Sequence, residues 1–240
     1  MLEFARRTRA DFARLLMEYQ FAVDEVSTKI SILRREFLHL HSYNPIEHVT
    51  TRVKSVESIF EKLLRKGFEP TIASARENLT DIGGVRIICS FIADTYRVMG
   101  ALTKQNDLRI VTVKDYIKQP KPNGYKSLHL LVEVPVFLSS GPLPLTVEVQ
   151  IRTIAMDFWA SLEHKIYYKY SGDVPAHLVE SLTEAADLAE QLDVRMEQLH
   201  SQVHGSGGAD VPRGGMLDES VVRRMWQQSR HASPGGPISS

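Results

Sequence analysis

The chain has 240 residues, of which 43% are hydrophobic, and its 29 basic side chains are balanced by 29 acidic ones. This length fits one large domain or one medium domain with appendages. The balanced charge excludes a global field that would draw the protein to nucleic acid or to a membrane surface. No apolar run approaches the ~18 residues of a membrane span. The single cysteine, Cys89, has no partner for an internal disulfide, so we expect a cytoplasmic protein without membrane association.

Two long amphipathic helices are predicted near the ends of the chain. Apolar residues recur at alternating steps of four and three along residues 12–37 and again along residues 178–203, which indicates narrow helical seams. We expect these helices within residues 1–45 and 171–204. Each seam either packs on the core of its own subunit or joins subunits in a homo-oligomer, with a tetramer as one arrangement, and the pattern leaves both readings open. The composition of residues 205–240 predicts a flexible tail.

Between the two long helices, residues 46–170 form the predicted core. Helices are expected at Ser55–Lys66, Asp94–Gln105 and Thr153–Tyr168, and strands at Val85–Phe91, Leu108–Lys114, Lys126–Val134 and Leu145–Arg152. The short loop between the last two strands favours an antiparallel hairpin. In the helix at 153–168, the apolar residues expected to point inward are Ile154, Phe158, Leu162 and Ile166. The fold class that follows is α+β, with a mixed, largely antiparallel sheet flanked by helices.

The strand at Leu145–Arg152 carries the most informative polar pattern. Its apolar residues alternate with Glu148, Gln150 and Arg152, so a carboxylate, an amide and a guanidinium share one face. These groups suit a metal ion and a charged substrate. For the strand alone, an ordinary solvent-facing surface is an equally good reading.

A second group of polar residues surrounds the helix at 55–66. Its members are Arg52, Lys54, Ser58, Lys62 and Arg65. A phosphate chain needs several converging cations, and residues four apart on a helix share a face. Because Glu57 and Glu61 are interspersed, a solvated helix face is the better reading of this segment when it is taken alone.

Two residues at the beginning of the strand at 85–91 have a similar double reading. Asp81 precedes a Gly-Gly pair and is placed like a Mg²⁺ ligand at a strand mouth, although it would also stabilise a turn. Arg86 alternates with apolar neighbours, so it leaves the core face, and its planar guanidinium is able to stack on a base.

The segment from residue 114 to 129 combines cations with aromatic rings. Its lysines, Lys114, Lys118 and Lys121, lie close to Tyr116, Tyr125 and His129. Lysines suit phosphates and a ring suits a base. The Asn-Gly-Tyr loop alone is a weak signal.

In their order along the chain, the motifs RVKSVESIFEK, DIGGVRI, KDYI, PKPNGYKSLH and EVQIRT resemble the synthetase domain of the RelA/SpoT family, with a nucleotidyltransferase-like core. The short length is similar to that of the small stand-alone alarmone synthetases. The resemblance implies transfer of the β,γ-pyrophosphate of ATP to the 3′-hydroxyl of GDP or GTP, with AMP released. It also implies an enzyme of the stringent response without a hydrolase domain.

The resemblance assigns roles to the candidate residues. It implies that Asp81 and Glu148 are catalytic residues and bind Mg²⁺, with Glu148 as the base. The ATP-binding residues would be Arg52, Lys54, Ser58, Lys62, Arg65 and Arg86, and those for GDP or GTP would be Lys114, Lys121, Asn123, Tyr125, His129 and Gln150. The alternatives are a different nucleotidyltransferase and a catalytically inactive nucleotide- or RNA-binding relative. The neutral charge gives regulation by RNA no support.

Overall fold

A five-stranded mixed sheet forms the centre of the computed structural model, which describes residues 2–40, 43–169 and 175–204. In the spatial order β1-β2-β5-β4-β3, its strands are β1 (Ile46–Val53), β2 (Gly83–Cys89), β5 (Gly141–Thr153), β4 (Leu128–Leu138) and β3 (Arg109–Asp115). Neighbouring strands pair antiparallel except β2 and β5, which are parallel. The expected α+β class with a largely antiparallel sheet is confirmed, and so is the β4–β5 hairpin. The flexible tail predicted at 205–240 lies outside the described residues.

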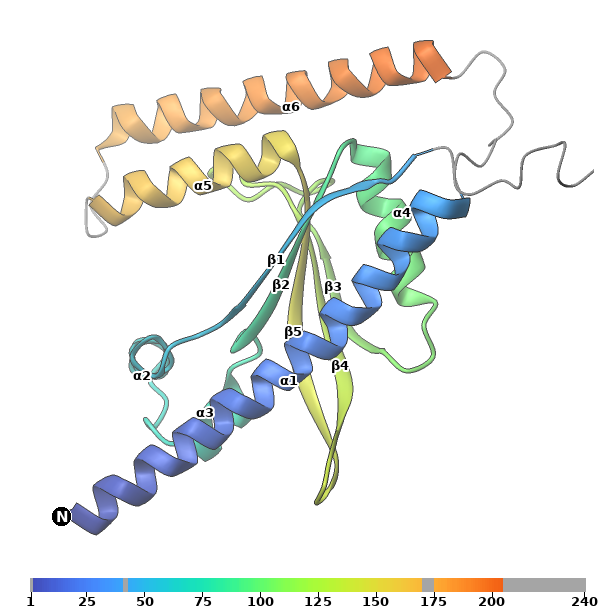
Figure 1. Cartoon of the computed structure of the whole chain (residues 1–240). Coiled ribbons are helices and arrows are strands. Elements are labelled where there is room, and N and C mark those ends of the chain that lie inside the picture. Colours follow the sequence, from blue (N-terminus) through green and yellow to red (C-terminus); the bar gives the residue numbers. More distant parts are fainter. Residues whose placement is uncertain (1, 41–42, 170–174, 205–240) are drawn as a thin grey trace, which may run out of the picture.

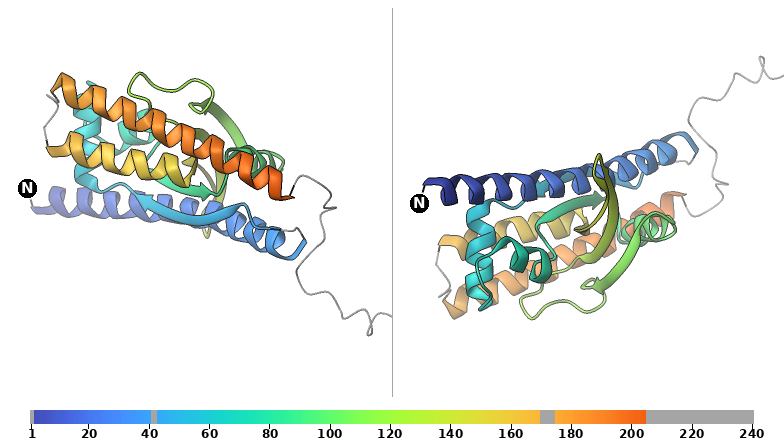
Figure 2. Two further views of the ribbon diagram at one scale, coloured as in Figure 1. Left: turned by 90° about the horizontal axis from the view of Figure 1, so that it is seen from above. Right: turned by 90° about the horizontal axis from the view of Figure 1, so that it is seen from below.

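Helices cover both faces of the sheet. They are α1 (Leu2–Leu40), α2 (Val56–Arg65), α3 (Ile72–Asn78), α4 (Ile92–Thr103), α5 (Ile154–Lys169) and α6 (Ala176–His204). The long α1 lies on one side of the sheet, whereas α5 and α6 lie side by side on the other side (Figure 1 and Figure 2). Within the described ranges, none of the helices is long and apolar enough to cross a membrane.

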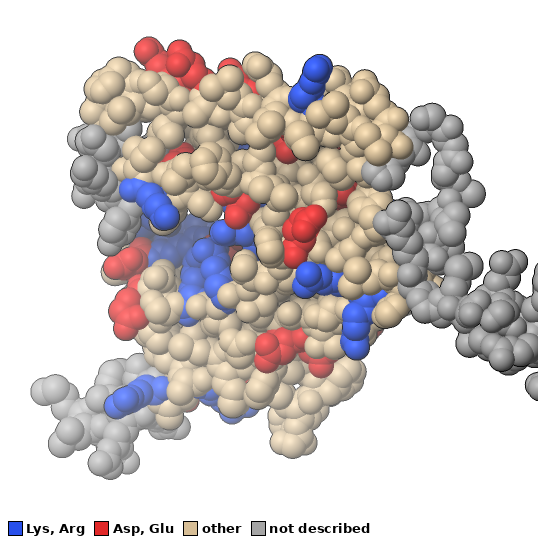
Figure 3. Space-filling model, turned by 45° about the horizontal axis from the view of Figure 1, so that its top comes forward, with Lys and Arg blue, Asp and Glu red and all other residues tan. Residues whose placement is uncertain are grey.

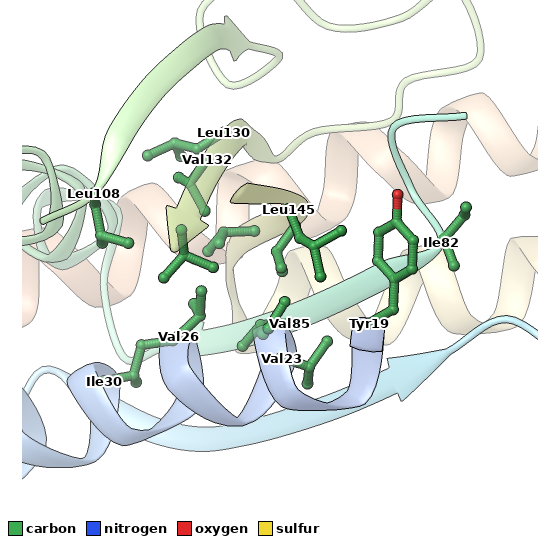
Figure 4. Close-up of a cluster of buried hydrophobic side chains, with 14 of the residues drawn as sticks. Tyr19, Val23, Val26, Ile30, Ile82, Val85, Leu108, Leu130, Val132 and Leu145 are labelled. Atoms are coloured by element: carbon green, nitrogen blue, oxygen red, sulfur yellow. The ribbon is translucent and has the colours of Figure 1, made fainter. Parts of the chain in front are cut away.

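The main hydrophobic core lies between α1 and the sheet. Tyr19, Val23, Val26 and Ile30 on α1 are buried against apolar strand residues such as Val85 (Figure 4). For the first helix, this arrangement decides between the two readings that the sequence left open. The apolar seam of the first helix packs on the core of its own chain.

The second seam has a different environment. On α6, the predicted seam residues Leu192, Met196, Leu199 and Val203 are 43–75% exposed. The residue of α6 that is buried among apolar neighbours is Ala186, which contacts Trp159 and Ala160 of α5 in a separate small cluster. The C-terminal part of this seam is therefore left uncovered by the rest of the described chain.

The inward face predicted for α5 is wrong. Ile154, Phe158 and Leu162 are 40–66% exposed, whereas Met156, Trp159 and Ala160 are buried. The indole nitrogen of Trp159 donates a hydrogen bond to the Leu182 carbonyl of α6 at 2.8 Å, so packing against α6 determines which face points inward. Periodicity shows which residues share a face and does not show which neighbour covers it.

Two elements, β1 and α3, were not predicted. β1 is an edge strand with only Ile46 fully buried, so it lacks a clean alternation of apolar and polar residues. α3 has only seven residues, and its N-cap is Thr71, whose hydroxyl accepts from the Ser74 amide. Along the chain, β1 precedes α2 and α3 follows it, so these two elements link the cationic segment around α2 to the sheet on either side.

Gly83 and Gly84, expected in a turn, are instead the first two residues of β2. A Cβ added at Gly83 would lie 2.9 Å from Cγ2 of Val23 on α1. The missing side chain therefore permits the close contact between α1 and the sheet.

We expect Gly83→Ala to lower the free energy of unfolding by about 1–3 kcal/mol, because overpacking forces the buried Val23 or the backbone to move. Urea denaturation measures the change. Gly100→Ala on α4 is the matched control, since nothing lies within 4 Å of its added Cβ, and it is expected to leave the stability unchanged or raise it by up to about 1 kcal/mol. Equal unfolding free energies for Gly83→Ala and the wild type would contradict this account.

The last residue of β2 is Cys89, which is a free cysteine with a fully buried side chain. Burial raises the pKa of the Cys89 thiol far above its ordinary value, and the nearby carboxylates of Asp94 and Glu47 act in the same direction. The thiol therefore stays protonated at neutral pH.

Candidate active site

The register of the sheet gathers the polar candidates into rows on the face opposite α1. One row crosses all five strands through Thr50, Arg86, Gln150, His129 and Lys114. Arg86, His129 and Gln150 are only partly buried, whereas their apolar neighbours along the strands are buried. The alternation read from the sequence therefore places them on the side away from the core, as expected.

The next row brings Arg52, Gly84 and Glu148 together. A Cβ at Gly84 would lie 3.4 Å from Nε of Arg52, so the glycine leaves space for the arginine to cross β2. Nη2 of Arg52 is 4.0 Å from Oε2 of Glu148. The two glycines thus leave space on opposite faces of the sheet. The absence of a side chain at Gly83 lets α1 pack closely, and its absence at Gly84 leaves room for the Arg52 side chain.

Two adjoining cavities lie over these rows. The first has a volume of about 200 Å³, and among its lining residues are Arg52, Arg86, Glu148 and Gln150. The second, of about 410 Å³, shares Arg52, Arg86 and Gln150 and extends over Tyr125 and Arg152 to α5. Basic side chains gather in a hollow on this side of the molecule (Figure 3). Two joined cavities with cations between them suit two anionic ligands bound side by side.

Glu148 is held by hydrogen bonds at both oxygens. Nδ1 of His129 is 3.2 Å from Oε1, and Nε2 of Gln150 donates to Oε2 at 2.9 Å. Burial raises the pKa of Glu148, but His129 and Gln150 outweigh this effect and hold the pKa below its ordinary value. Glu148 is therefore ionised at neutral pH and ready to accept a proton or to bind a cation.

Asp81 lies at the entrance to β2 between two lysines. Nζ of Lys62 is 2.5 Å from Oδ2, and Nζ of Lys54 is 3.0 Å from the same oxygen. Burial raises the pKa of Asp81, yet these ammonium groups outweigh it and lower the pKa overall. The other oxygen, Oδ1, is buried and has no hydrogen-bond partner among the described residues.

The donor set fits Mg²⁺. This ion usually takes one or two protein carboxylates together with waters and substrate phosphates. The unpartnered Oδ1 of Asp81 offers one ligand. Asp81 precedes by three residues Gly84, the residue of β2 that pairs with Glu148 on β5, and the charge of Asp81 acts to raise the pKa of Glu148. The described residues contain no group of three or more His, Cys, Asp or Glu side chains that could hold a metal ion.

The loop at residues 116–127 brings the aromatic candidates to this site. Nζ of Lys121 lies 4.5 Å from the ring centroid of Tyr125. Asn123 donates a hydrogen bond to Glu163 of α5 at 3.0 Å and accepts one from the Tyr125 amide. In this structure Asn123 therefore shapes the loop and ties it to α5.

Tyr125 connects the loop to Glu148 by way of His129. Its hydroxyl is 2.7 Å from Nε2 of His129 and accepts from Nη2 of Arg152 at 2.5 Å. If His129 directs its Nδ1 proton to Glu148, Nε2 accepts from the Tyr125 hydroxyl, a tautomer inferred from the hydrogen-bond network. A continuous network thus runs from Arg152 through Tyr125 and His129 to Glu148.

Asp157 on α5 is a member of the site that the sequence analysis did not assign. Its Oδ1 is 3.1 Å from Nη1 of Arg152 and 3.2 Å from Nη1 of Arg86. These ion pairs orient two guanidinium groups that line the larger cavity. Asp157 follows the EVQIRT motif by four residues, and only the turn from β5 into α5 brings it back over the sheet.

Three predicted residues are less closely gathered. Ser58 is exposed and its amide donates to Ser55, the N-cap residue of α2, and Arg65 is exposed at the last turn of that helix. Lys114 shares the row of His129 but is exposed on β3. None of the three lines either cavity over the rows. Their assignment to nucleotide binding remains a prediction.

Comparisons with known proteins agree with this geometry. Residues 51–173 match the family model described as the region found in RelA / SpoT proteins. The chain is 54% identical over 193 residues to the GTP pyrophosphokinase YwaC of Bacillus subtilis, covering 80% of this chain and 92% of that protein. It is 39% identical over 196 residues to YjbM, another GTP pyrophosphokinase of Bacillus subtilis, with coverage of 82% and 92%.

Solved structures give the same result. Small alarmone synthetase 2 from Bacillus subtilis aligns with a TM-score of 0.74 and 53% identity over 80% of this chain and 99% of that chain. Small alarmone synthetase 1 from Bacillus subtilis, bound to its product pppGpp, aligns with a TM-score of 0.76 and 38% identity over 81% and 98%. The chain therefore belongs to the RelA/SpoT family, and it is similar in sequence and structure to small alarmone synthetases.

Proposed function

We propose that this protein is a (p)ppGpp synthetase, which transfers the β,γ-pyrophosphate of ATP to the 3′-hydroxyl of GDP or GTP and releases AMP. The observation that carries the proposal is the convergence of Arg52, Arg86, Glu148 and Gln150 on two joined cavities of one sheet face. The related proteins are GTP pyrophosphokinases.

The donor half of the reaction falls to the cationic side of the site. Arg52 and Arg86 line both cavities, so they are placed to hold adenine or the phosphates between them. Lys54 and Lys62 lie beside Asp81 and would offset the charge on the triphosphate. When AMP leaves, the bond from the α,β-bridging oxygen to the β-phosphorus breaks, and these cations stabilise the negative charge that stays on AMP.

The acceptor half falls to β4, β5 and the 116–127 loop. Tyr125 offers its ring to guanine, and His129, Lys121 and Gln150 would contact the rest of the nucleotide. Glu148 takes the proton from the ribose 3′-hydroxyl as the oxygen attacks the β-phosphorus. Asp81 and Glu148 would hold Mg²⁺, which supplies charge neutralisation to the transferring phosphates when bound.

Product analysis tests the proposal directly. Purified protein is incubated with labelled ATP, Mg²⁺ and either GDP or GTP. The expected result is AMP together with an equal amount of ppGpp or pppGpp. Release of pyrophosphate with transfer of AMP would indicate a different nucleotidyltransferase. Nucleotide binding without any product would indicate the catalytically inactive alternative.

A homo-oligomer is also part of the proposal. The exposed apolar residues of α6 described above, Leu192, Met196, Leu199 and Val203, offer a surface for docking a second copy of this chain. We expect a wild-type oligomer by light scattering, and a smaller species when Leu192 and Met196 are both replaced by Glu. Ile32→Glu on α1, also at an exposed apolar position, is the matched control. A monomeric wild type at tens of micromolar would overturn this part.

A cytoplasmic location is proposed as well, because ATP and guanosine nucleotides are available there.

A further inference from the structure

The helix α6 contacts the site from behind, through residues to which no catalytic role has been given. Nζ of Lys126 is 2.5 Å from Oε2 of Glu190 on α6, and the Lys126 side chain is only 9% exposed. Two residues before Lys126, Gly124 has φ +83°, and a Cβ added there would lie 2.5 Å from the Cβ of Ala186 on α6. The backbone of the 116–127 loop therefore rests directly on α6.

A second anchor joins α6 to the end of β5. The hydroxyl of Thr153 donates to Oδ2 of Asp193 on α6 at 2.6 Å and accepts from the Met156 amide in the first turn of α5 at 3.1 Å. Both Thr153 and Asp193 are buried. α6 is thus attached to the point where the polar strand β5 turns into α5.

The two anchors hold residues that are next in sequence to Tyr125 and Arg152, two members of the hydrogen-bond network that leads to Glu148. Lys126 directly follows Tyr125, and Thr153 directly follows Arg152. Tyr125 and Arg152 are bonded to each other and line the larger cavity. Glu190 and Asp193, one turn apart on α6, therefore each hold the chain one residue beyond a member of this pair.

We infer that α6 is a positioning element for the acceptor nucleotide, with Glu190 and Asp193 setting the Tyr125–Arg152 pair. This inference rests on the proposed function. In the proposed function Tyr125 contacts the acceptor nucleotide, and Arg152 is bonded to it. Loosening the anchors therefore weakens acceptor binding, whereas Arg52 and Lys62, on the donor side, keep their own partners.

Simple coverage of the core does not explain this face of α6. The large apolar residues of the helix, such as Leu188 and Leu192, point away into solvent at 65% and 55% exposure. The side that meets the loop and β5 carries Ala186, Glu190 and Asp193 instead. Tyr125 packs on the small cluster around Ala186, separate from the main core. The face is built for a close polar contact with the site.

The charge of Asp193 adds to this picture. Burial raises the pKa of Asp193 to about 6, and the charges of Glu197 and Glu190 act in the same direction, while the bond from Thr153 and the charge of Lys126 lower it. The raised pKa means that the buried ionised carboxylate destabilises the folded state at neutral pH. A position that served stability alone would be better filled by a neutral residue.

The test exchanges the charges of the first anchor, which is the ion pair between Lys126 and Glu190. Lys126→Glu and Glu190→Lys are each expected to raise the KM for GDP or GTP about tenfold or more, with kcat and the KM for ATP within about twofold. The double variant restores the pair in reverse and is expected to return the acceptor KM to within about threefold of the wild type. Glu184→Lys, an exposed site on α6 with the same charge change, is the matched control and should match the wild type.

The second anchor supplies a conservative pair of variants. Asp193→Asn keeps an oxygen that accepts the Thr153 hydroxyl, so its acceptor KM stays near the wild-type value, whereas Asp193→Ala raises it. Calorimetric binding of GDP gives the same ranking without turnover. An unchanged acceptor KM in Lys126→Glu and Glu190→Lys would overturn the inference. An equal loss of kcat and of both substrate affinities would also overturn it, because it would indicate a purely structural role. A wild type that forms no product would instead refute the proposed function.

Discussion

Glu148→Gln is expected to lower kcat by at least about 10²-fold, the lower range for loss of a positioned general base. The amide has nearly the shape of the carboxylate but cannot accept the 3′-hydroxyl proton. Because the pKa of Glu148 is held below its ordinary value, the wild-type carboxylate is fully ionised at neutral pH, so the variant removes a base that is always available. The measurement is the initial rate of AMP and (p)ppGpp formation with both substrates saturating.

Glu133→Gln provides the matched control for this experiment. Glu133 is also on the polar side of the sheet, on β4, where it pairs with Arg109 and lines neither cavity over the rows. Its amide variant is expected to turn over like the wild type. Circular dichroism and binding of a non-hydrolysable ATP analogue should show that Glu148→Gln keeps its fold and its nucleotide site. Normal turnover by Glu148→Gln would show that another group takes the proton.

Asp81→Asn is expected to cause a loss of similar size, about 10²-fold or more, for a different reason. The substitution removes the proposed Mg²⁺ ligand and leaves Lys54 and Lys62 facing a neutral amide. We expect the remaining activity to need a higher Mg²⁺ concentration. A titration of activity with Mg²⁺, together with Mn²⁺ binding followed by electron paramagnetic resonance in the presence of an ATP analogue, measures both effects.

The same variant has a predicted pH signature in stability. The folded-state pKa of Asp81 is lowered, so the carboxylate stabilises the wild type above the ordinary aspartate pKa, and this contribution is lost as the pH falls through the lowered value. The difference in melting temperature between wild type and Asp81→Asn should therefore be present at pH 7 and shrink in acid. Asp187→Asn, at an exposed position of α6, is the control and should melt like the wild type at both pH values. An Asp81→Asn enzyme with normal activity and normal Mg²⁺ dependence would rule out this ligand.

The polar face of the site was predictable because it depends on local alternation. In β4 and β5, every second residue is buried, and Glu148, Gln150 and His129 fall between the buried ones. What alternation could not give is the order of the strands. Arg52 was expected just before a helix, yet it lies on an edge strand that pairs with β2 and so reaches Glu148 across Gly84.

The helices show where sequence patterns stop being informative. For α1, the apolar seam faces the sheet and is buried, which is one of the two readings that its pattern left open. In α5 and α6, the most regular apolar stripes are exposed, since Trp159, Ala186 and Asp193 determine the contact between the two helices and the sheet. Asp157 had no motif of its own, and its pairing with Arg86 and Arg152 depends on how α5 folds back over the strands.

The single thiol of the chain, Cys89 at the end of β2, can report when this strand opens. Alkylating reagents attack the thiolate, and in the folded protein Cys89 is both buried and held in the protonated form. Labelling must therefore wait until the strand between β1 and β5 opens. The speed of modification by iodoacetamide, with and without nucleotides, then measures how strongly substrates clamp the middle of the molecule, with no engineered probe.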